Sequence, residues 1–496
     1  MKLSKYNKFV KHNNNDYLLF NSISGSLIKV SNQIKKDIET KNLSEDNFKK
    51  LKELGFFKKE EGDERATLRK KYEAKTLNHL NKYMFITVTD RCNLGCHYCF
   101  EEKNQWINMS DETVDALIEF SKKFLSATKT DSFGIGWYGG EPTINMKAIK
   151  KLSSFYKDFC EKNDIHFSQM IISNGTTFNE SVCETLINLG IKKAQITVDG
   201  IKEDHDKSRP YLKDLTLDQM SPAQRSQAQK LNPSLSLNVI NNEKPKENLI
   251  TKSCFDEIIK GIEKYVQKGG EVSLRMNVNS KTIEKTTQLL DDLHKRKLFY
   301  RNENGGFLYA YAQPIYDIGS CGNNNYESSG CGSCPSKTTT EDPVTVNSMK
   351  VSEFAEKVHI IKDWYKSKGI KWFDHSNEMH FTGDTCTANK KYEYVVNPDG
   401  TLTKCTHDVG KPEKVIGSVF DDNVNPDDMN IPNTSYDRFN PFDDKECFGC
   451  EVLPICMGGC KSNNNAGEAK EYEAGCSTIK YSYEEDIIRL YESSKS

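Results

Sequence analysis

Residues 83–100 read Tyr83-Met84-Phe85-Ile86-Thr87-Val88-Thr89-Asp90-Arg91-Cys92-Asn93-Leu94-Gly95-Cys96-His97-Tyr98-Cys99-Phe100. The apolar run at the start of this stretch predicts a buried strand that leads directly into a loop with three cysteines. The C-x3-C-x2-C spacing supplies three thiolates, whereas a four-iron cluster normally has four protein ligands. An iron without a protein ligand is an open coordination site. The loop therefore predicts a cluster that Cys92, Cys96 and Cys99 hold and that binds a substrate or cosubstrate at its open iron.

A zinc site or a set of structural thiols is the alternative interpretation of these three cysteines. Two features of the stretch favour the cluster. The aromatic residue Tyr98 stands directly before the last cysteine, and the predicted strand runs into the loop without a break.

The composition limits the classes of partner. The 496 residues include 69 Lys and Arg against 71 Asp and Glu, so no basic surface indicates nucleic-acid binding. No apolar run approaches the roughly 20 residues of a membrane span, and Met1–Lys5 does not begin a signal peptide. We therefore expect a cytoplasmic protein without a membrane or nucleic-acid partner. In a reducing compartment, metal ligation explains sixteen cysteines better than disulfides do.

A second motif, Trp137-Tyr138-Gly139-Gly140-Glu141-Pro142, follows the next predicted strand. Paired glycines allow a backbone to approach a ligand more closely than residues with side chains do. Together with the cysteine loop, this motif resembles the radical S-adenosylmethionine (SAM) enzymes, whose fold is a partial (β/α)6 barrel. The resemblance implies that SAM chelates the open iron and that one electron cleaves it to a 5′-deoxyadenosyl radical.

The same resemblance implies contacts with SAM at further positions. Glu141 and the glycines before it would contact the SAM amino group, and the guanidinium of Arg209 would contact its carboxylate. For Arg275 and His205 an ordinary structural role stays open. The residues assigned to SAM are Tyr98, Gly139, Gly140, Glu141, Ser173, Asn174, Thr197, Arg209, Arg275 and Asn277.

Residues 80–312 alternate strand and helix patterns, which indicates an α/β fold with a parallel sheet and helices outside it. Two of the helical stretches are Asp111–Leu125 and Phe255–Lys268, and residues 212–250 are expected to form a polar surface insertion. The predicted strands are Tyr83–Val88, Phe133–Tyr138, Met170–Ser173, Ala194–Val198, Val272–Val278 and Gly306–Tyr311.

The second group of cysteines has a regular spacing, C-x13-G-x4-C, then C-x2-C-x5-C-x3-C, then one more cysteine. This order resembles the SPASM domain, an extension that some radical SAM enzymes carry, and the glycine is expected to form a hairpin turn. The resemblance implies two auxiliary four-iron clusters. Cys386, Cys405 and Cys460 would hold the first, and Cys447, Cys450, Cys456 and Cys476 would hold the second. Cys456 and Cys460 are expected one helical turn apart, so that each can serve a different cluster.

The first auxiliary cluster lacks an obvious fourth ligand. We assign Cys334, while Cys321, Cys331, His380 and an open iron stay as alternatives. A zinc ribbon is the alternative for Cys447–Cys460 alone. Cys160, Cys183 and Cys254 stand singly in helical patterns and are expected to be buried apolar residues.

Two terminal modules flank the predicted barrel and the cysteine-rich region 313–480. Residues 1–60 form the N-terminal module, and a helix at 481–496 forms the C-terminal one. Tyr17–Phe20 and Ser26–Val30 predict a hairpin, and a capped helix follows from Ser44 to Phe57. Hairpin and helices resemble the winged-helix-like elements that bind the leader of a ribosomally made peptide by strand addition. A purely structural extension is the alternative.

These resemblances imply a radical SAM oxidoreductase that matures a precursor peptide, with three 4Fe–4S clusters and a flavodoxin- or ferredoxin-type electron donor. The expected product is a thioether or a carbon–carbon or ether crosslink. An anaerobic sulfatase maturase is one alternative, although such enzymes have an Asp where Thr406 follows Cys405. A peptide epimerase and a non-catalytic iron–sulfur scaffold are the others. No catalytic acid, base or hydrogen-atom donor is assigned.

Overall fold

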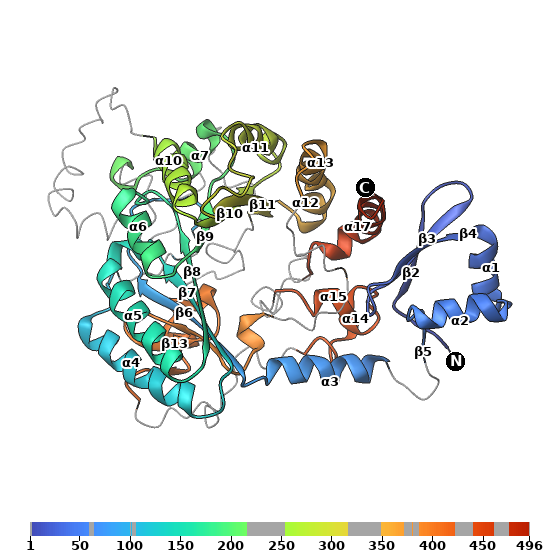
Figure 1. Cartoon of the computed structure of the whole chain (residues 1–496), viewed down its shortest axis with the longest axis horizontal. Helices are drawn as coiled ribbons and strands as arrows, with labels where there is room; N and C mark the ends of the chain where they lie inside the picture. The colour runs from blue at the N-terminus through green and yellow to red at the C-terminus, as the bar shows by residue number, and fades with distance from the viewer. Residues whose placement is uncertain are drawn as a thin grey trace, which may run out of the picture.

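The computed structural model describes residues 2–58, 64–99, 101, 106–215, 253–315, 349–371, 379, 386–421, 440–460 and 476–495. In Figure 1 a small N-terminal module lies at one side of a larger α/β body, and the C-terminal helix α17 (Ile479–Ser493) lies between them.

A nine-stranded sheet forms the centre of the α/β body, in the order β11-β10-β9-β8-β7-β6-β12-β13-β14. Its strands β6 to β11 all run parallel to their neighbours. Each lies where the sequence predicts a strand, so the predicted parallel sheet is confirmed. These strands are β6 (Asn81–Thr89), β7 (Ser132–Gly139), β8 (His166–Ser173), β9 (Lys193–Thr197), β10 (Glu271–Val278) and β11 (Phe307–Pro314).

Helices connect the parallel strands and lie on the outside of the sheet (Figure 1). The side chain of Ser110 accepts a hydrogen bond from the Thr113 backbone N–H and so begins the first of them. The connecting helices are α4 (Asp111–Ser126), α5 (Met146–Lys162), α6 (Glu180–Asn188), α7 (Lys202–Ser208), α10 (Cys254–Gln267) and α11 (Thr286–Lys295). Because all parallel strands point the same way, their carboxyl ends meet at one edge.

Apolar residues of sheet and helices form one continuous core. Ile86, Trp137 and Ile196 from three strands are completely buried, as are Cys160 and Cys183 from two helices. Burying one such large side chain stabilises the fold by about 1.5–3 kcal/mol. The expected burial of these two cysteines and of Cys254, which is 2% exposed, is confirmed, although the Cys254 thiol also makes hydrogen bonds.

A hairpin extends the sheet beyond β6. Strand β12 (Glu393–Val396) pairs parallel with β6, and β13 (Thr401–Thr403) and β14 (Gly417–Ser418) follow antiparallel. Gly400, at φ +85°, forms the turn between the first two, as predicted.

The C-terminal helices differ from expectation in two places. Residues 351–368 have a continuous helical pattern in the sequence, but the structure divides them at Val358 into two helices. Helix α15 ends where Met457 takes a left-handed φ of +48°. The expectation that Cys456 and Cys460 lie one helical turn apart is therefore wrong. The helices are α12 (Val351–Lys357), α13 (His359–Ser367), α14 (Lys445–Phe448), α15 (Leu453–Cys456) and α17, whose start lies two residues before the expected 481.

The N-terminal module has a three-stranded antiparallel sheet in the order β2-β3-β4. The predicted hairpin is confirmed as β3 and β4, whereas the outer strand β2 was not anticipated. The elements are β1 (Lys2–Leu3), β2 (Asn7–Lys11), β3 (Asp16–Asn21), β4 (Leu27–Ser31), α1 (Asn32–Thr40), α2 (Glu45–Glu53), β5 (Phe57–Lys58) and α3 (Glu64–Thr76).

The N-terminal sheet packs against the C-terminal part of the chain. Leu18 and Phe20 of β3 share an apolar cluster with Val452, Tyr483 and Ile487. Of the predicted polar insertion 212–250, only residues 212–215 belong to the described part of the chain.

Candidate functional site

The cysteine loop, residues 92–99, leaves the carboxyl end of β6 and lies against the segment that follows α7. The backbone N–H of Gly95 donates to the carbonyl of Pro210 at 2.8 Å. That of His97 donates to the carbonyl of Ser208 at 3.2 Å. These bonds attach the loop to the end of the β9–α7 unit.

The glycine motif holds the other side of the loop by backbone contact. The N–H of Gly140 donates to the carbonyl of Thr89, and the N–H of Glu141 donates to that of Arg91, at 3.1 and 2.8 Å. A Cβ on Gly139 would lie 2.0 Å from the Thr89 oxygen, and one on Gly140 would lie 2.4 Å from the Arg91 oxygen. The two glycines are therefore needed for the motif to pack against the start of the cysteine loop.

The carboxylate of Glu141 is completely buried at the ends of β7 and β8. It accepts hydrogen bonds from the backbone N–H and hydroxyl of Thr143, from the hydroxyl of Ser173 and from the backbone N–H of Asn174. Burial raises the pKa of Glu141, and these donors oppose the rise. Glu141 thus joins two strand ends beside the cysteine loop.

Asn174 connects the end of β8 to the cysteines. Its side-chain nitrogen donates to the Asn93 side chain at 2.8 Å and lies 3.7 Å from the sulfur of Cys92. Burial, and then the neighbouring Cys96, raise the pKa of the Cys92 thiol to about 12. A thiol with so high a pKa needs a nearby positive charge, such as a metal, to become a thiolate at neutral pH.

Tyr98 is the centre of a polar group at this edge. Its hydroxyl donates to the carboxylate of Asp199 and accepts from Arg209 Nη1 at 2.8 Å and from Asn277 Nδ2 at 3.0 Å. The side chain of Arg275 donates in turn to Asn277 Oδ1 at 2.9 Å. Burial raises the pKa of Tyr98 well above 10, so the phenol stays a hydrogen-bond donor.

Asp199 was not among the predicted site residues, although it lies just after β9 and is 2% exposed. The available signal was its position two residues after Thr197, at a predicted strand end. Thr197 itself is buried and pairs in register with Arg275 of β10. The strand ends thus bring together the predicted residues on β9 and β10.

Two buried atoms of this group, Asp199 Oδ1 and Arg209 Nε, have no hydrogen-bond partner among the described residues. Leaving such atoms without a partner costs about 1–3 kcal/mol each. A ligand with a positively charged amino group and a carboxylate can satisfy an acid and a guanidinium together. SAM has both groups, so the residues present fit it.

The spacing of the loop cysteines bears on the zinc alternative. A tetrahedral zinc ion lies about 2.3 Å from each of its sulfur ligands, so these sulfurs are close together. In a four-iron cluster each cysteine binds a different iron, so the sulfurs lie further apart. Among the described residues, one group of three candidate ligand atoms lies within 4.8 Å of one another, and it does not include a loop cysteine. The loop geometry therefore favours a cluster.

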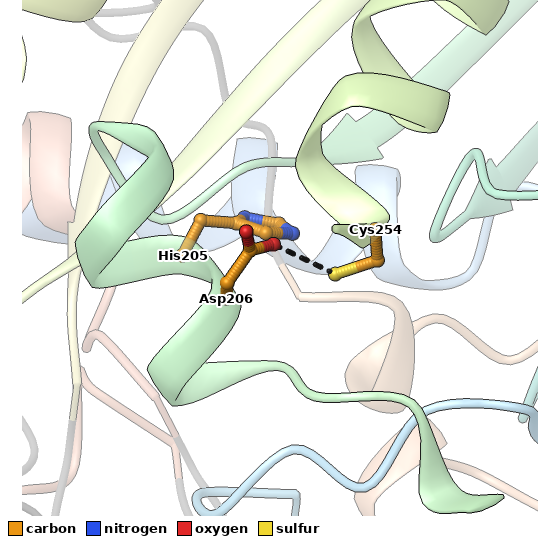
Figure 2. A group of neighbouring side chains, drawn as sticks. All are labelled: His205, Asp206 and Cys254. Carbon is orange, nitrogen blue, oxygen red and sulfur yellow. Dashed lines mark hydrogen bonds between the residues drawn. The ribbon is translucent and has the colours of Figure 1, made fainter. Parts of the chain in front are cut away.

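That compact group is His205, Asp206 and Cys254, where α7 meets α10 (Figure 2). His205 Nδ1 accepts the backbone N–H of Asp199 at 3.1 Å, so a neutral ring carries its proton on Nε2 and has no lone pair there for a metal. Asp206 accepts the Cys254 thiol at 3.4 Å and the Phe255 backbone N–H at 3.1 Å. The group therefore acts as a junction of two helices, which favours the structural role for His205.

In the second cysteine group, the β12–β13 hairpin separates Cys386 from Cys405. Cys460 follows the left-handed turn at Met457 and Gly458. The candidates Cys321, Cys331, Cys334 and His380 lie outside the described residues.

Two of the four cysteines assigned to the second auxiliary cluster have pKa values that the other cysteines of the group raise. Burial, and then the charges of Asp444, Cys456 and Cys450, raise the pKa of Cys447 to about 12. Burial also raises the pKa of Cys456, to which the charges of Cys476 and Cys450 add. These mutual effects place the four side chains in one neighbourhood.

Residues 86–222 match the family model described as the Radical SAM superfamily. The matched segment begins in β6 and includes the cysteine loop, the glycine motif and Arg209. The segment from β6 to the residues after α7 is a radical SAM domain. The description of this family names SAM, which agrees with the buried acid and guanidinium described above.

Two curated relatives match parts of the chain. The radical SAM cyclopropyl synthase TigE of Paramaledivibacter caminithermalis is 24% identical over 255 residues, which cover 43% of this chain and 51% of TigE. An uncharacterised protein of Methanocaldococcus jannaschii, MJ0907, is 32% identical over 130 residues, which cover 26% of this chain and 42% of MJ0907. The chain thus spans about half the length of these relatives.

A solved structure, native anSMEcpe with bound AdoMet and Cp18Cys peptide, matches 84% of this chain and 99% of its own with a TM-score of 0.56 and 17% identity. This likeness establishes a shared fold. Among the described residues, no helix combines the length and apolar character needed to cross a membrane.

Proposed function

We propose that the protein is a radical SAM oxidoreductase that matures a ribosomally made precursor peptide by forming a thioether or a carbon–carbon or ether crosslink. The observation that carries the catalytic part is the backbone contact between the glycine motif and the cysteine loop, Glu141 to Arg91 at 2.8 Å. This contact supports a site in which the three loop cysteines would hold a cluster beside the buried donors and acceptors that fit SAM.

The residues of the radical SAM domain then have distinct tasks. Cys92, Cys96 and Cys99 would hold the cluster, and Asp199 and Arg209 would bind the two charged groups of SAM. Bound together, the cluster and SAM supply hydrogen-atom abstraction from an unactivated carbon. The chain itself orients the ligands through Glu141 and excludes water, since Glu141 and Asp199 are at most 2% exposed.

The remaining domains are assigned as follows. Residues 80–312 would form the catalytic barrel, and residues 313–480 a SPASM domain with two auxiliary clusters. The neighbourhood of Cys447, Cys450, Cys456 and Cys476 supports the second of them. A flavodoxin- or ferredoxin-type protein would deliver the electrons, and the cytoplasm would be the site of action.

Residues 1–60 would recognise the peptide. Their three-stranded sheet ends in two outer strands, β2 and β4, to which an extended segment can add by main-chain hydrogen bonds. The fold likeness to anSMEcpe, a protein crystallised with a peptide, and the sequence relation to the synthase TigE support a biosynthetic role.

Two other outcomes belong to the same chemistry. A sulfatase maturase would form formylglycine, but Thr406 occupies the place of its Asp, and Asp408, two residues on, is 2% exposed. A peptide epimerase would need a thiol that returns a hydrogen atom to the peptide.

The test of the cofactor is anaerobic reconstitution with iron and sulfide, followed by SAM and dithionite. We expect 5′-deoxyadenosine from the wild type, with about twelve irons for three four-iron clusters. The triple variant of Cys92, Cys96 and Cys99 to Ala should yield none. Cys160→Ala is the matched control, because Cys160 is a completely buried core residue and should leave iron and product unchanged. Stoichiometric zinc in place of iron would contradict the proposal.

The test of the reaction uses short peptides encoded beside the gene. A crosslink removes two hydrogens from the peptide, an epimerisation leaves its mass unchanged in ordinary water, and formylglycine appears as an aldehyde. Mass spectrometry and aldehyde labelling separate these outcomes, and only the first supports the proposed maturase.

A further inference from the structure

The hydroxyl of Tyr98 uses all its hydrogen-bonding capacity. A phenol has one donor and two acceptor positions. Here the donor serves Asp199, and the acceptors serve Arg209 at 2.8 Å and Asn277 at 3.0 Å. Tyr98 therefore makes three bonds with side chains from outside the cysteine loop.

The partners come from different parts of the barrel. Asp199 follows β9, Arg209 follows α7, and Asn277 belongs to β10. Tyr98 stands between Cys96 and Cys99, so one oxygen atom connects the cysteines to three segments that would surround SAM. Through Asn277 the connection extends to Arg275, whose Nε donates to Asn277 Oδ1 at 2.9 Å.

All three partners are buried, with exposures of 2% for Asp199, 7% for Arg209 and 9% for Asn277. Water cannot easily replace the hydroxyl there, and buried polar groups without partners are costly. The glycine contacts hold only the start of the loop, at Thr89 and Arg91. Backbone bonds from Gly95 and His97 hold the middle of the loop, and the Tyr98 hydroxyl adds the side-chain attachment next to Cys99.

We propose that the Tyr98 hydroxyl is a positioning group that fixes the cysteine loop relative to Arg209 and Asn277. A phenylalanine ring would fill nearly the same volume. The hydroxyl, in contrast, fixes the positions of the Arg209 guanidinium and the Asn277 side-chain amide by hydrogen bonds. The inference rests on the proposed function, because it concerns how the chain presents its SAM-facing groups.

The decisive variant is Tyr98→Phe, which removes one oxygen and keeps the ring. We expect SAM to bind about tenfold to a hundredfold more weakly, since two donors and a carboxylate lose their partner. The electron paramagnetic resonance signal of the reduced cluster should respond less to added SAM. Tyr156→Phe is the matched control, because Tyr156 is completely buried in the core and its hydroxyl bonds Ser121 of α4. Equal SAM affinity and spectra in wild type and Tyr98→Phe would overturn the inference.

A double-mutant cycle separates positioning from general damage. Residues that act through one another give non-additive effects. Asn277→Ala alone should weaken SAM binding, and the double variant should bind SAM within about twofold of Tyr98→Phe. Fully additive losses would show that the hydroxyl does not act through Asn277 and would contradict the proposal.

Hydrogen exchange on the metal-free protein tests the attachment without any cofactor. Residues 92–99 should exchange faster in Tyr98→Phe than in the wild type or Tyr156→Phe, at a similar thermal midpoint. Unchanged exchange would refute the attachment even if the enzyme is active. Faster exchange in a chain that binds neither iron nor SAM would support it while the proposed function fails.

Discussion

The ammonium of Lys8 lies 2.9 Å from a carboxylate oxygen of Glu451, although 443 residues separate them. A second carboxylate, that of Glu484 in α17, lies 2.8 Å away. Burial lowers the pKa of Lys8, but the two carboxylates outweigh it and raise the pKa overall. Since Glu451 stands next to Cys450, these pairs attach the N-terminal sheet to the loop assigned to the second auxiliary cluster. Half-exposed pairs of this kind contribute about 0–1 kcal/mol.

The apolar contact beside these pairs should contribute more. Ile487 of α17 is completely buried against Leu18 and Phe20 of the N-terminal sheet. Ile487→Ala should weaken this docking by about 2–5 kcal/mol, because the cavity adds to the lost burial. Hydrogen exchange of residues 2–58 measures the effect. Lys366→Ala is the control. It breaks an exposed ion pair between α13 and Glu492, which lies on α17 like Ile487, and it should change the exchange of residues 2–58 little. Equal exchange in both variants would contradict the docking argument.

The barrel could be predicted from sequence because its strands are continuous apolar runs, as in β6, where Ile86 and Val88 are completely buried. Strand β2 escaped prediction because Asn7, Lys8 and Lys11 make most of it polar. Its pairing with β3 supplies the missing stabilisation, and pairing partners cannot be read from a local pattern.

The site residues could be predicted where the spacing of residue types indicates their chemistry. They could not be predicted where the role of a residue depends on the direction of its side chain. The cysteines and glycines follow from their intervals. The direction of the Glu141 carboxylate, toward Ser173 and Asn174, depends on how β7 and β8 align. The role of Asp199 likewise appears only when Tyr98, about a hundred residues away in sequence, is brought to it by the fold.

Glu141→Gln tests the carboxylate at these strand ends. The carboxylate accepts from Thr143, Ser173 and Asn174, and an amide nitrogen in its place would face one or more of these donors. We expect a loss of about 1–3 kcal/mol in the free energy of unfolding. Chemical denaturation of the metal-free protein measures it. Glu180→Gln removes a carboxylate from an exposed pair with Lys268 and should cost less than about 1 kcal/mol. If both variants lose the same small amount, the buried network is not stabilising.

His205 predicts a dependence of stability on pH. Burial, and then the charge of Arg209, lower the pKa of His205 well below 6.5. Below pH 6.5 the unfolded chain binds a proton that the folded protein does not, so stability is complete above this pH and falls as the pH drops. The loss is up to about 1.4 kcal/mol per pH unit for one such group.

The measurement compares denaturation from about pH 7.5 to about pH 5.5 in the wild type and His205→Asn. The oxygen of Asn can accept the Asp199 N–H as Nδ1 does, but it does not titrate. We expect a smaller slope in the variant. Burial also lowers the pKa values of His97 and His359, and these groups contribute equally to both proteins. An identical dependence of the free energy of unfolding on pH in the wild type and His205→Asn would show that folding does not lower the pKa of His205.

Gly140→Ala separates damage to the site from loss of stability. The new Cβ would lie 2.4 Å from the Arg91 carbonyl oxygen, so the backbone just before Cys92 must shift. Overpacking of this kind costs about 1–3 kcal/mol, and we expect lower iron content and weaker SAM binding as well. Gly190→Ala is the control, because Gly190 has a φ of +85° but open space, with its nearest neighbour at 3.7 Å. Because an alanine is strained at this φ, the Gly190→Ala variant should lose about 1–2 kcal/mol of its free energy of unfolding. It should keep its iron. If iron content and SAM affinity fall equally in both variants, the site depends on overall stability alone. The specific packing of the glycine motif on the cysteine loop would then lose its support.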